Sequence, residues 1–563
     1  MNTENFRTTL PHCLLYWEQK TPNDVYLTQP MGNGVVKEYT WKQVAHEVKC
    51  MAAYLQSLGL SPKSHIALLG RNSAHWIMAD LAIWLAGHVT VPLYPTLNGE
   101  TAEYILEHGD ARLLMLGKMD GKGDGWKEIQ HVIPKDFPII GMPLSPLKNV
   151  PQWDDIVVKT APLQHPHMPD PDELATIVYT SGSTGRPKGV MHSFRTMITV
   201  IDGMESIWGF TNKERMLSYL PLAHVAERAA VETTSLYFGF QVFFSEGLET
   251  FQADLQRAQP TIFFSVPRLW TKFYLGVNEK LPPAKQKLMF NIPVLGKLVK
   301  KKILKQLGMD KVRAALTGSA PLPPNIIEWY RNLGLELLDV YGMSENFAYS
   351  HASKPGEVRV GYVGSVNPGC QHRIAENGEI EVWSPGQMIG YYKMPGKMEE
   401  ELTTDGYFRT GDRGEIDEKG RLKITGRVKE LFKTSKGKYV APVPIENKLN
   451  NHAKLEVVCV TGPSQPQPFA LFMLSLDAQK ELSRGELQKD QLTAEFHDLL
   501  KEVNETLEDH ETLDYVVVVK DQWTMENGFL TPTMKIKRNV IEERYLNNAD
   551  EWVTRKVKVI WED

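Results

Sequence analysis

Short apolar runs alternate with helix-like segments through the first half of the chain, and this rhythm constrains the fold more than any other feature. The run HIALLG (His65 to Gly70) precedes WIMADLAIWLAG (Trp76 to Gly87), which precedes VTVPLYP (Val89 to Pro95). Strands buried on both faces have such continuous apolar runs, and strand, helix and strand in succession are typical of parallel pairing. The sequence therefore predicts an α/β fold with parallel sheets covered by helices.

Two changes of pattern divide the 563 residues. After about residue 375, the segments GEIEVWSPGQMIGYYKMP and GYFRTGDRGEIDEKGRLKITGRVKE are rich in glycine and alternating stretches, which indicates a small antiparallel β region. After Lys429, mixed α/β patterns return, with a charged helical stretch from Gly485 to Leu507 and the strand-like YVVVV (Tyr515 to Val519). We expect a large N-terminal domain of several subdomains over residues 1–428 and a small α+β C-terminal domain over residues 429–563.

Charge and cysteine content exclude several classes of protein. The net charge of -5 argues against a nucleic-acid partner, which normally requires a clear basic excess. The four cysteines, Cys13, Cys50, Cys370 and Cys459, are far apart and favour a reducing compartment over a disulfide framework or zinc site. We find neither a signal-like N-terminus nor a run of about 18 apolar residues, so we expect a cytoplasmic protein that does not span a membrane.

The stretch YTSGSTGRPKGV (Tyr179 to Val190) gathers glycines, hydroxyl residues and two cations after an apolar run. Such a composition is common in solvated turns. However, glycines let backbone N–H groups approach an anion closely, and the hydroxyls and cations add donors and charge, so the loop can hold a polyphosphate. It is not a Walker A loop, because Lys188 follows Pro187 and precedes Gly189.

Further motifs follow this loop in a fixed order. They are LLDVYGMSEN (Leu337 to Asn346), GYFRTGD (Gly406 to Asp412), GRVKELFKTSKGKYVAPVPIE (Gly426 to Glu446) and LTPTMKIKR (Leu530 to Arg538). With the loop, they resemble the adenylate-forming superfamily of acyl-CoA synthetases, luciferases and peptide-synthetase adenylation domains over nearly the whole chain.

Within that superfamily, four stretches resemble the long-chain fatty acyl-CoA synthetases. They are LYPTLNGETAEYIL (Leu93 to Leu106), LPLAHVAER (Leu220 to Arg228), FFSVPRLW (Phe263 to Trp270) and the LTPTMKIKR ending. The resemblance implies an N-terminal adenylation domain, a mobile C-terminal domain, and ATP, coenzyme A and a medium- or long-chain fatty acid as substrates.

The resemblance also implies which residues bind ATP. The loop from Thr180 to Lys188 is expected to hold the β- and γ-phosphates, and Tyr341 to offer a flat face to adenine. Asp412 is expected to accept hydrogen bonds from the ribose hydroxyls, with Arg427 close by. The predicted nucleotide-binding set is Thr180, Ser181, Gly182, Ser183, Thr184, Gly185, Lys188, Gly318, Ser319, Ala320, Tyr341, Gly342, Ser344, Asp412 and Arg427.

Three residues are predicted to be catalytic. Glu345 offers a hard oxygen ligand for Mg²⁺, together with the hydroxyl of Thr180. His224 matches the position that lies near the substrate carboxylate in similar proteins, and Lys535 matches the lysine placed beside the carboxylate and α-phosphate during adenylation. The family pattern has a glycine just before that lysine, where this chain has Met534.

The implied reaction has two steps. A fatty acid and MgATP give an acyl adenylate and pyrophosphate, and the thiol of coenzyme A then converts the adenylate to acyl-CoA and AMP. Between the steps, the C-terminal domain is expected to rotate about a hinge at Lys429. The loop TSKGKYV (Thr434 to Val440) would then face the active site, with Lys436, Gly437 and Lys438 predicted to contact coenzyme A.

Three alternatives share the same motifs. The chain could be a fatty acyl-AMP ligase or acyl-carrier-protein ligase that passes its adenylate to a carrier protein. It could be a luciferase-like oxygenase, or a catalytically silent acyl- or nucleotide-binding protein. The sequence leaves the acyl chain length and the oligomeric state open.

Two apolar segments have more than one interpretation. TTSLYFGFQVFF (Thr233 to Phe244) could form the wall of a tunnel for the fatty chain, or ordinary core. FNIPVLGKLVKKKILKQLGM (Phe290 to Met309) predicts a basic amphipathic helix, with the apolar arc Leu295, Leu298, Val299, Ile303 and Leu307 interrupted by Lys302. Such a helix either makes peripheral contact with an anionic membrane or packs on the domain surface.

Overall fold

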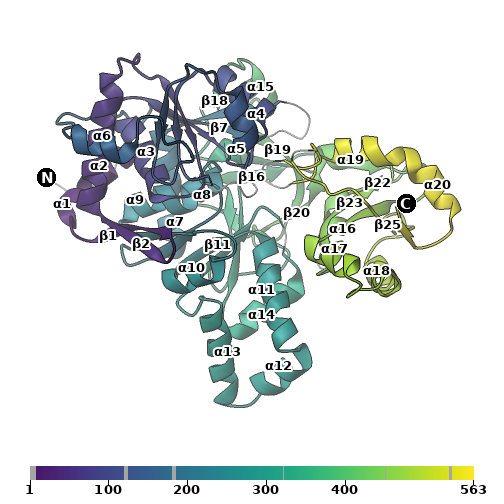
Figure 1. The fold of residues 1–563 in the computed structure, drawn as a ribbon. Coiled ribbons are helices and arrows are strands. Elements are labelled where there is room, and N and C mark those ends of the chain that lie inside the picture. The colour runs from purple at the N-terminus through teal and green to yellow at the C-terminus, as the bar shows by residue number, and fades with distance from the viewer. Residues whose placement is uncertain are drawn as a thin grey trace.

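The computed structural model describes residues 8–119, 124–180, 186–320, 322–450, 452–525, 527–531 and 535–562. Figure 1 shows a large N-terminal part, a helical hairpin that projects below it, and a separate C-terminal lobe at the side. Among the described residues, no helix combines the length and the apolar character that crossing a bilayer requires.

The predicted alternation of strands and helices forms a seven-stranded sheet in the order β18-β8-β7-β4-β3-β5-β6. Strands β3 to β7 run parallel, and β8 and β18 add antiparallel strands at one edge. The strands are β3 (His65–Leu69), β4 (Val89–Leu93), β5 (Ala111–Leu116), β6 (Ile139–Gly141), β7 (Leu174–Thr180), β8 (Lys188–Ser193) and β18 (Gly390–Tyr391).

Helix α3 (Ala74–Leu85) connects β3 to β4 and is buried along its whole length. It is buried all round because it lies inside the core of the large lobe instead of on its surface, and nearly all of its residues are apolar. The hydroxyl of Ser73 caps its first turn by accepting a hydrogen bond from the Trp76 N–H. The predicted parallel α/β core is thus confirmed in this region.

Two further sheets complete the large lobe. One has the order β2-β1-β10-β9 and the other β11-β12-β13-β14-β15, in which β11, β12 and β13 are parallel. Their strands are β1 (Val25–Gly32), β2 (Val35–Thr40), β9 (Arg215–Ser218), β10 (Gln241–Phe244), β11 (Ile262–Ser265), β12 (Ala314–Gly318), β13 (Leu337–Tyr341), β14 (His351–Ala352) and β15 (Ser365–Val366).

Helices cover these sheets and form the projecting hairpin. Those of the large lobe are α1 (Leu10–Lys20), α2 (Trp41–Ser57), α4 (Gly99–His108), α5 (Trp126–Val132), α6 (Trp153–Lys159), α7 (Phe194–Trp208), α8 (Val225–Glu227), α9 (Thr234–Phe238), α10 (Phe251–Ala258), α11 (Pro267–Lys280), α12 (Pro283–Phe290), α13 (Leu295–Gln306), α14 (Pro324–Leu333) and α15 (Lys397–Glu401). A π-helical turn, Arg228–Thr233, separates α8 from α9.

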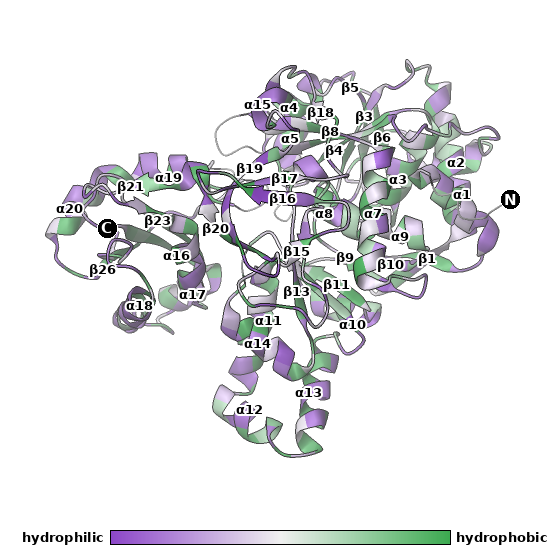
Figure 2. Ribbon diagram, turned by 180° about the vertical axis from the view of Figure 1, so that it is seen from behind, coloured by the Kyte–Doolittle hydropathy of each residue, from purple (hydrophilic) through white to green (hydrophobic). Residues whose placement is uncertain are grey.

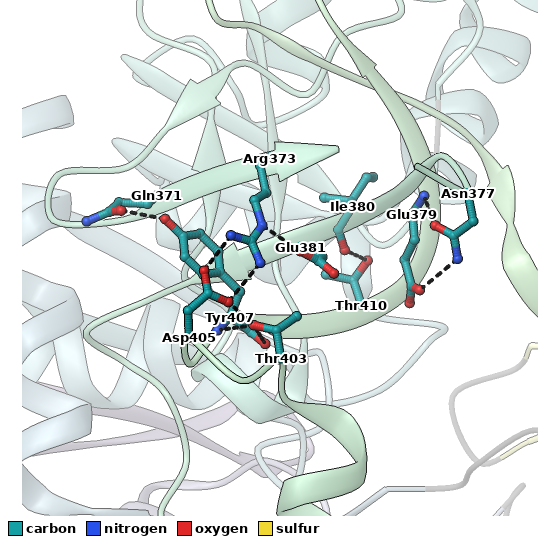
Figure 3. Close-up of polar contacts among 10 residues, drawn as sticks. All are labelled: Gln371, Arg373, Asn377, Glu379, Ile380, Glu381, Thr403, Asp405, Tyr407 and Thr410. Carbon is teal, nitrogen blue, oxygen red and sulfur yellow. Dashed lines mark hydrogen bonds and ion pairs between the residues drawn. The ribbon is translucent and has the colours of Figure 1, made fainter. Parts of the chain in front are cut away.

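The predicted antiparallel region is confirmed as the sheet β16-β17-β19-β20. Its strands are β16 (Gln371–Ile374), β17 (Glu379–Trp383), β19 (Phe408–Ile416) and β20 (Leu422–Arg427). Figure 3 shows how polar side chains tie these strands together, with Arg373 bonded to both Glu381 and Asp405, and Thr410 donating to the Ile380 carbonyl at 2.7 Å.

The C-terminal lobe contains the sheet β23-β24-β25-β26, with apolar clusters of its own on the two faces. Its strands are β23 (Leu455–Thr461), β24 (Phe469–Leu474), β25 (Val516–Val518) and β26 (Val559–Trp561), and β21 (Phe432–Lys433) pairs with β22 (Tyr439–Val440). The helices are α16 (Pro442–Leu449), α17 (Leu476–Ser483), α18 (Lys489–Asn504), α19 (Arg538–Tyr545) and α20 (Ala549–Thr554).

Candidate active site

A cavity of about 1920 Å³ lies between the large lobe and the C-terminal lobe. The ends of β7, β12 and β13 line it from one side, and β20 and the turn before α19 line it from the other. In parallel sheets, ligands bind beyond the carboxyl ends of the strands, so this position is the expected one for a site. Most of the predicted site residues that the structure describes line this cavity.

Tyr341, Asp412 and Arg427 form one polar group at the floor of the cavity. The Tyr341 hydroxyl donates to Asp412 Oδ2 at 2.7 Å, and Arg427 Nε lies 3.0 Å from Asp412 Oδ1. Asp412 and Arg427 face each other in the pairing of β19 with β20, which explains why residues 15 positions apart meet. Burial, followed by the charge of Asp412, raises the pKa of Tyr341 well above its ordinary value, so its hydroxyl keeps its proton.

Glu379 and Thr410 hold the irregular part of β19 that carries Asp412. Glu379 Oε1 accepts from the Gly411 N–H at 2.9 Å, and the Thr410 hydroxyl accepts from the Asp412 N–H at 3.1 Å. Figure 3 shows Glu379 and Thr410 on neighbouring strands of the antiparallel sheet. The Asp412 carboxylate is therefore fixed before any ligand binds.

Glu345 lies in a single helical turn, Ser344–Asn346, which follows β13. Its carboxylate accepts a hydrogen bond from the Tyr391 hydroxyl at 3.0 Å, and burial raises its pKa. The ring of His192 bonds the Ser344 carbonyl at 2.7 Å and supports this turn from behind. Magnesium in nucleotide sites takes one or two carboxylates with phosphate oxygens and water, so Glu345 and the Thr180 hydroxyl, which line the same cavity, suit such an ion by their chemistry.

The phosphate loop is described only at its two ends. Thr180 and Lys188 face each other at the end of the β7–β8 hairpin from which the loop leaves, and both line the cavity. The predicted residues Ser181, Gly182, Ser183, Thr184 and Gly185 lie outside the described residues. Lys188 Nζ lies 3.3 Å from Glu401 Oε1 and 4.9 Å from the centre of the Tyr391 ring, so it points toward the Glu345 end of the cavity.

Backbone segments at the ends of β12 and β13 lie next to the cavity. Gly318, Ser319 and Ala320 follow β12, and Gly342 follows β13; all of them line the cavity. A side chain at Gly342 would lie 2.4 Å from the Ala348 backbone, and one at Gly318 would lie 2.9 Å from Val340. Neighbouring residues leave no room for a side chain at these two positions, so glycine is required. The absence of a side chain also lets a ligand approach the ends of the strands.

Lys535 and His224 approach each other from different lobes. Burial, and to a smaller extent the charge of Lys535, lowers the pKa of His224 to about 4, so the imidazole is neutral at pH 7. His224 Nδ1 accepts a hydrogen bond from the Ala226 N–H at 3.1 Å, which leaves the ring proton on Nε2 as a donor. Burial, and to a smaller extent the charge of Arg427, lowers the pKa of Lys535. Part of the Lys535 side chain is nevertheless accessible from the cavity.

Arg538, the last residue of the LTPTMKIKR motif, is an internal anchor of the C-terminal lobe. Its guanidinium is buried and bonds Glu446 at 2.8 Å and the Val460 carbonyl at 2.7 Å. It also lies 3.4 Å from Glu430, beside the predicted hinge residue Lys429. Arg538 therefore anchors the turn that carries Lys535 to the body of the C-terminal lobe.

Some predicted residues lie away from the cavity. Lys436, Gly437 and Lys438, in the β21–β22 turn, are exposed and do not line the cavity that the described residues form. The Thr233 to Phe244 segment does not line it either; Leu236, Phe238, Phe240 and Phe244 pack in the core instead. The interpretation of this segment as a tunnel wall is therefore wrong, because its apolar side chains are used by the sheet packing.

The apolar part of the cavity is formed by other elements. Its lining includes Met204, Trp208, Phe210, Met216, Ile262 and Phe264, which come from α7, β9 and β11 and the segments beside them. Behind His224, Arg228 forms buried ion pairs with Asp80 and Glu232 and donates to the Thr176 hydroxyl at 2.7 Å. This cluster fixes the LPLAHVAER segment against β7.

Sequence reasoning missed Tyr391, Glu401 and Glu379. Tyr391 and Glu401 contact the predicted residues Glu345 and Lys188, and Glu379 accepts from the Gly411 N–H next to Asp412. Each lies in a stretch with no local pattern that marks it as functional. Tyr391 and Glu401 reach the cavity only because β18 pairs with β8 and brings α15 beside Lys188.

With this geometry, the chain can be assigned to a class by comparison. It belongs to the AMP-binding enzyme family: the model of the AMP-binding enzyme matches residues 15–392, and the model of the AMP-binding enzyme C-terminal domain matches residues 430–556. Solved structures with the same fold include the A domain of the carboxylic acid reductase of Segniliparus rugosus, with a TM-score of 0.79 at 19% identity over 98% of this chain and 94% of that one. The predicted superfamily and the two-lobed α/β fold are thus confirmed.

Among curated proteins, similar sequences are synthetases of acyl-CoA. The long-chain-fatty-acid–CoA ligase FadD15 of Mycobacterium tuberculosis is 29% identical over 95% of this chain and 96% of its own length. The peroxisomal long chain acyl-CoA synthetase 6 of Arabidopsis thaliana is 28% identical over 91% of this chain and 81% of its own. The o-succinylbenzoate CoA synthetase of Bacillus subtilis, solved with ATP and a magnesium ion, has a TM-score of 0.70 at 21% identity over 94% of this chain and 98% of that one.

Proposed function

We propose that the protein ligates a medium- or long-chain fatty acid to coenzyme A, using ATP and forming an acyl adenylate on the way. The observation that carries this proposal is the meeting of Lys535 and His224 in a cavity that also holds the group of Tyr341, Asp412 and Arg427. The cations and the neutral imidazole donor lie where a carboxylate and an α-phosphate would come together.

In the first step, a carboxylate oxygen attacks the α-phosphorus of ATP, and the bond to the β-phosphate oxygen breaks to release pyrophosphate. The reacting groups are anions that repel one another, so the chain has to neutralise charge and hold them in line. Lys535 supplies a positive charge and His224 Nε2 a neutral hydrogen-bond donor to the carboxylate. No covalent bond to the protein is needed.

The metal ion of this step would be held by Glu345 and Thr180. Bound Mg²⁺ supplies charge neutralisation on the phosphate oxygens. The Tyr391 hydroxyl orients the Glu345 carboxylate, and Lys188 lies close enough to reach the same phosphates after leaving Glu401. These residues bind and position the polyphosphate.

The second step requires a different orientation of the C-terminal lobe. The thiol of coenzyme A attacks the carbonyl carbon of the adenylate, the thiol loses its proton, and AMP leaves as the thioester forms. We propose that the lobe, residues 429–563, rotates about Lys429 and removes Lys535 from the cavity. The rotation would bring Lys436, Gly437 and Lys438 toward the incoming coenzyme A.

The chain-length preference rests on the apolar part of the cavity and on the curated relatives. The lining from α7, β9 and β11 offers Met204, Trp208 and Phe264 to an acyl chain. All six side chains named above for the apolar lining are uncharged, so they offer contacts to an acyl chain and no ionic partner to a short polar acid. We therefore expect acetate to be a poor substrate.

AMP release with a panel of carboxylic acids, measured with and without coenzyme A, tests the proposal. We expect the highest kcat/KM with medium or long fatty acids, and acyl-CoA formation only when coenzyme A is present. Adenylate that accumulates and passes only to a carrier protein would identify an acyl-AMP ligase. Nucleotide binding without any AMP release would identify a silent binding protein, and oxygen consumption would identify an oxygenase.

A further inference from the structure

The hairpin of α12 and α13 projects from the large lobe and exposes apolar side chains at its tip. Of the sixteen large hydrophobic side chains exposed by the described residues, five lie between residues 288 and 298. They are Leu288, Ile292, Val294, Leu295 and Leu298, with exposed fractions of 41% to 70%. Such clustering is not expected of ordinary surface, on which exposed hydrophobic residues are scattered.

The predicted apolar arc is therefore divided between two environments. Ile303 and Leu307 pack in the core beneath α14, as a surface helix would. Leu298 and Leu295, about one and a half and two turns nearer the tip than Ile303, are 61% and 42% exposed. Figure 2 shows hydrophobic and hydrophilic residues mixed along this hairpin. Packing on the domain accounts for the base of α13 and not for its tip.

The turn between the helices holds the tip in place. The Leu295 N–H donates to the Pro293 carbonyl at 2.8 Å across Val294, whose φ of 67° is unusual for a β-branched residue. A side chain at Gly296 would meet the Phe290 carbonyl at 2.4 Å, so glycine allows α13 to pack closely on α12. The Val294 side chain, 70% exposed, is thus directed into solvent by an ordered turn.

Lysines surround the apolar tip, and acidic residues are missing from it. Residues 281–309 contain no Asp or Glu, although the whole chain has a net charge of -5. The lysines of this segment are Lys285, Lys287, Lys297, Lys300, Lys301, Lys302 and Lys305. Lys300 bonds Asn332 at 2.7 Å and belongs to the hairpin packing, while Lys301, Lys302 and Lys305 are exposed. Lys302 lies about 10 Å along the helix from Leu295, at 1.5 Å per residue.

We infer that the α12–α13 hairpin docks on an anionic lipid bilayer, with the apolar tip among the acyl chains and the lysines at the headgroups. In an anionic bilayer, negatively charged headgroups lie outside the apolar acyl chains. Apolar side chains at the tip can enter the acyl chains while the lysines behind them contact the headgroups, because a lysine side chain extends its charge several ångströms from the backbone. Exposed apolar side chains next to lysines suit a surface with an apolar interior and an anionic outer layer, and an anionic bilayer has both. This inference concerns attachment and does not depend on the proposed ligase reaction.

The hairpin is continuous with a helix of the cavity wall, so attachment at its tip would bring the cavity close to the membrane. Helix α11 runs directly into the hairpin, and its residues Leu275, Asn278 and Glu279 line the cavity. A bilayer at the tip would therefore lie at the end of a helix that forms the cavity wall, close to the phase into which fatty acids partition. Figure 1 shows α11 between the body of the molecule and the hairpin.

Co-sedimentation with vesicles tests the charge. Vesicles of phosphatidylcholine that contain about one third phosphatidylglycerol, an anionic lipid, should bind the protein. Vesicles of pure phosphatidylcholine should bind much less. Substituting Lys301, Lys302 and Lys305 by Glu should lower the binding constant about 100-fold, because each lysine near an anionic surface contributes roughly a factor of five. A matched triple of exposed lysines elsewhere, Lys213, Lys419 and Lys501 to Glu, should change binding far less.

Insertion of the tip is tested with a fluorescent label. The four native cysteines are buried, so Leu298→Cys offers an accessible thiol for an environment-sensitive dye. Anionic vesicles should shift its emission to the blue, and a dye on Val158→Cys, which is 85% exposed on α6, should not shift. The double change Val294→Ser with Leu298→Ser should weaken vesicle binding, while AMP release from a water-soluble medium-chain fatty acid in the absence of vesicles is retained.

Three results would overturn the inference. They are no binding of the wild-type chain to anionic vesicles at low salt, equal binding of the lysine variant and its matched control, and an unshifted dye on Leu298→Cys. If the tip substitutions instead change the sedimentation coefficient from that of a dimer to that of a monomer and leave vesicle binding intact, the hairpin contacts a second copy of the chain. A failed ligase assay would affect none of these readouts.

Discussion

The two lobes that face the cavity hold their functional groups in different ways. In the large lobe, Asp412 accepts a hydrogen bond from Tyr341 and forms an ion pair with Arg427. Glu345 accepts a hydrogen bond from Tyr391. In the C-terminal lobe, the Lys535 ammonium has no hydrogen bond or ion pair among the described residues, and only its backbone is fixed, to Thr531 at 3.0 Å. One lobe is prepared for a ligand, whereas the other presents a cation that can be withdrawn.

Contacts between the lobes suit such withdrawal. Arg268 of α11 pairs with Glu456 of β23 across the boundary, and the Arg268 side chain is 60% exposed. Exposed ion pairs contribute about 1 kcal/mol or less, so this contact selects an orientation without fixing it. The comparison implies that substitutions in the large lobe should impair every step that uses the nucleotide, and that substitution of Lys535 should impair one step only.

Replacement of Lys535 should have the largest effect. We expect Lys535→Ala to slow acyl-adenylate formation by roughly a hundred-fold or more, since a charge contact made in the transition state contributes a few kcal/mol. Thioester formation from supplied acyl-AMP and coenzyme A should be nearly unaffected. Single-turnover measurement of each half-reaction gives both rates.

Lys537→Ala is the matched control, because Lys537 lies two residues away and does not line the cavity of the described residues. Equal damage to both half-reactions by Lys535→Ala would contradict the delivery of this residue by a mobile lobe. So would a larger loss of adenylation in the Lys537 variant.

Glu345→Gln should reduce fatty-acid-dependent exchange of pyrophosphate into ATP by about tenfold to a hundred-fold, because an amide oxygen lacks the charge that magnesium prefers. The Tyr391 hydrogen bond can persist in this variant, so the turn should stay folded. The exchange rate is measured over a range of Mg²⁺ concentrations, with exposed Glu399→Gln of α15 as the control. An unchanged Mg²⁺ dependence would remove Glu345 from the metal site.

Raising the pH should separate the two half-reactions further. Burial, and then Arg427, lowers the pKa of Lys535 from its ordinary 10.5, so the ammonium is charged at low pH and loses its proton as pH rises through the lowered value. The kcat/KM for adenylation should therefore fall by up to about tenfold per pH unit on the alkaline side, beginning below pH 10.5. Lys535→Arg should move this fall to higher pH, since arginine stays charged. Identical alkaline limbs in both proteins would assign the titration to another group.

The smallest effect is expected at the boundary between the lobes. Glu456→Gln should change the ratio of adenylation to thioester formation by no more than about fivefold, with adenylation reduced, because an exposed pair contributes little. Asp172→Asn breaks an exposed pair with Arg195 inside the large lobe and should leave the ratio unchanged. If both variants gave the same ratio as the wild-type chain, the pair would have no part in setting the orientation.

The comparison of lobes also shows where sequence reasoning succeeded at the site. Glu345, Asp412, Lys188 and Lys535 were expected from motifs, and the structure brings them to one cavity. Tyr391 and Glu401 were not expected, since they come from a loop and a short helix whose function depends on the pairing of β18 with β8. The role of Arg538 was not expected either, because its burial depends on the packing of α19 on α16 and β23.

By itself, the sequence determined the parallel α/β core, the antiparallel region after residue 375, the family and the residues of its motifs. These features depend on local periodicity and on short patterns, because burial on one or both faces of a strand constrains each residue type. The tertiary structure alone decided which apolar segments line the cavity, which carboxylates are oriented by partners, and how the hairpin exposes Val294, Leu295 and Leu298. The physical reason is that burial and hydrogen bonding join residues far apart in the chain, such as Glu345 and Tyr391, and no local pattern encodes those contacts.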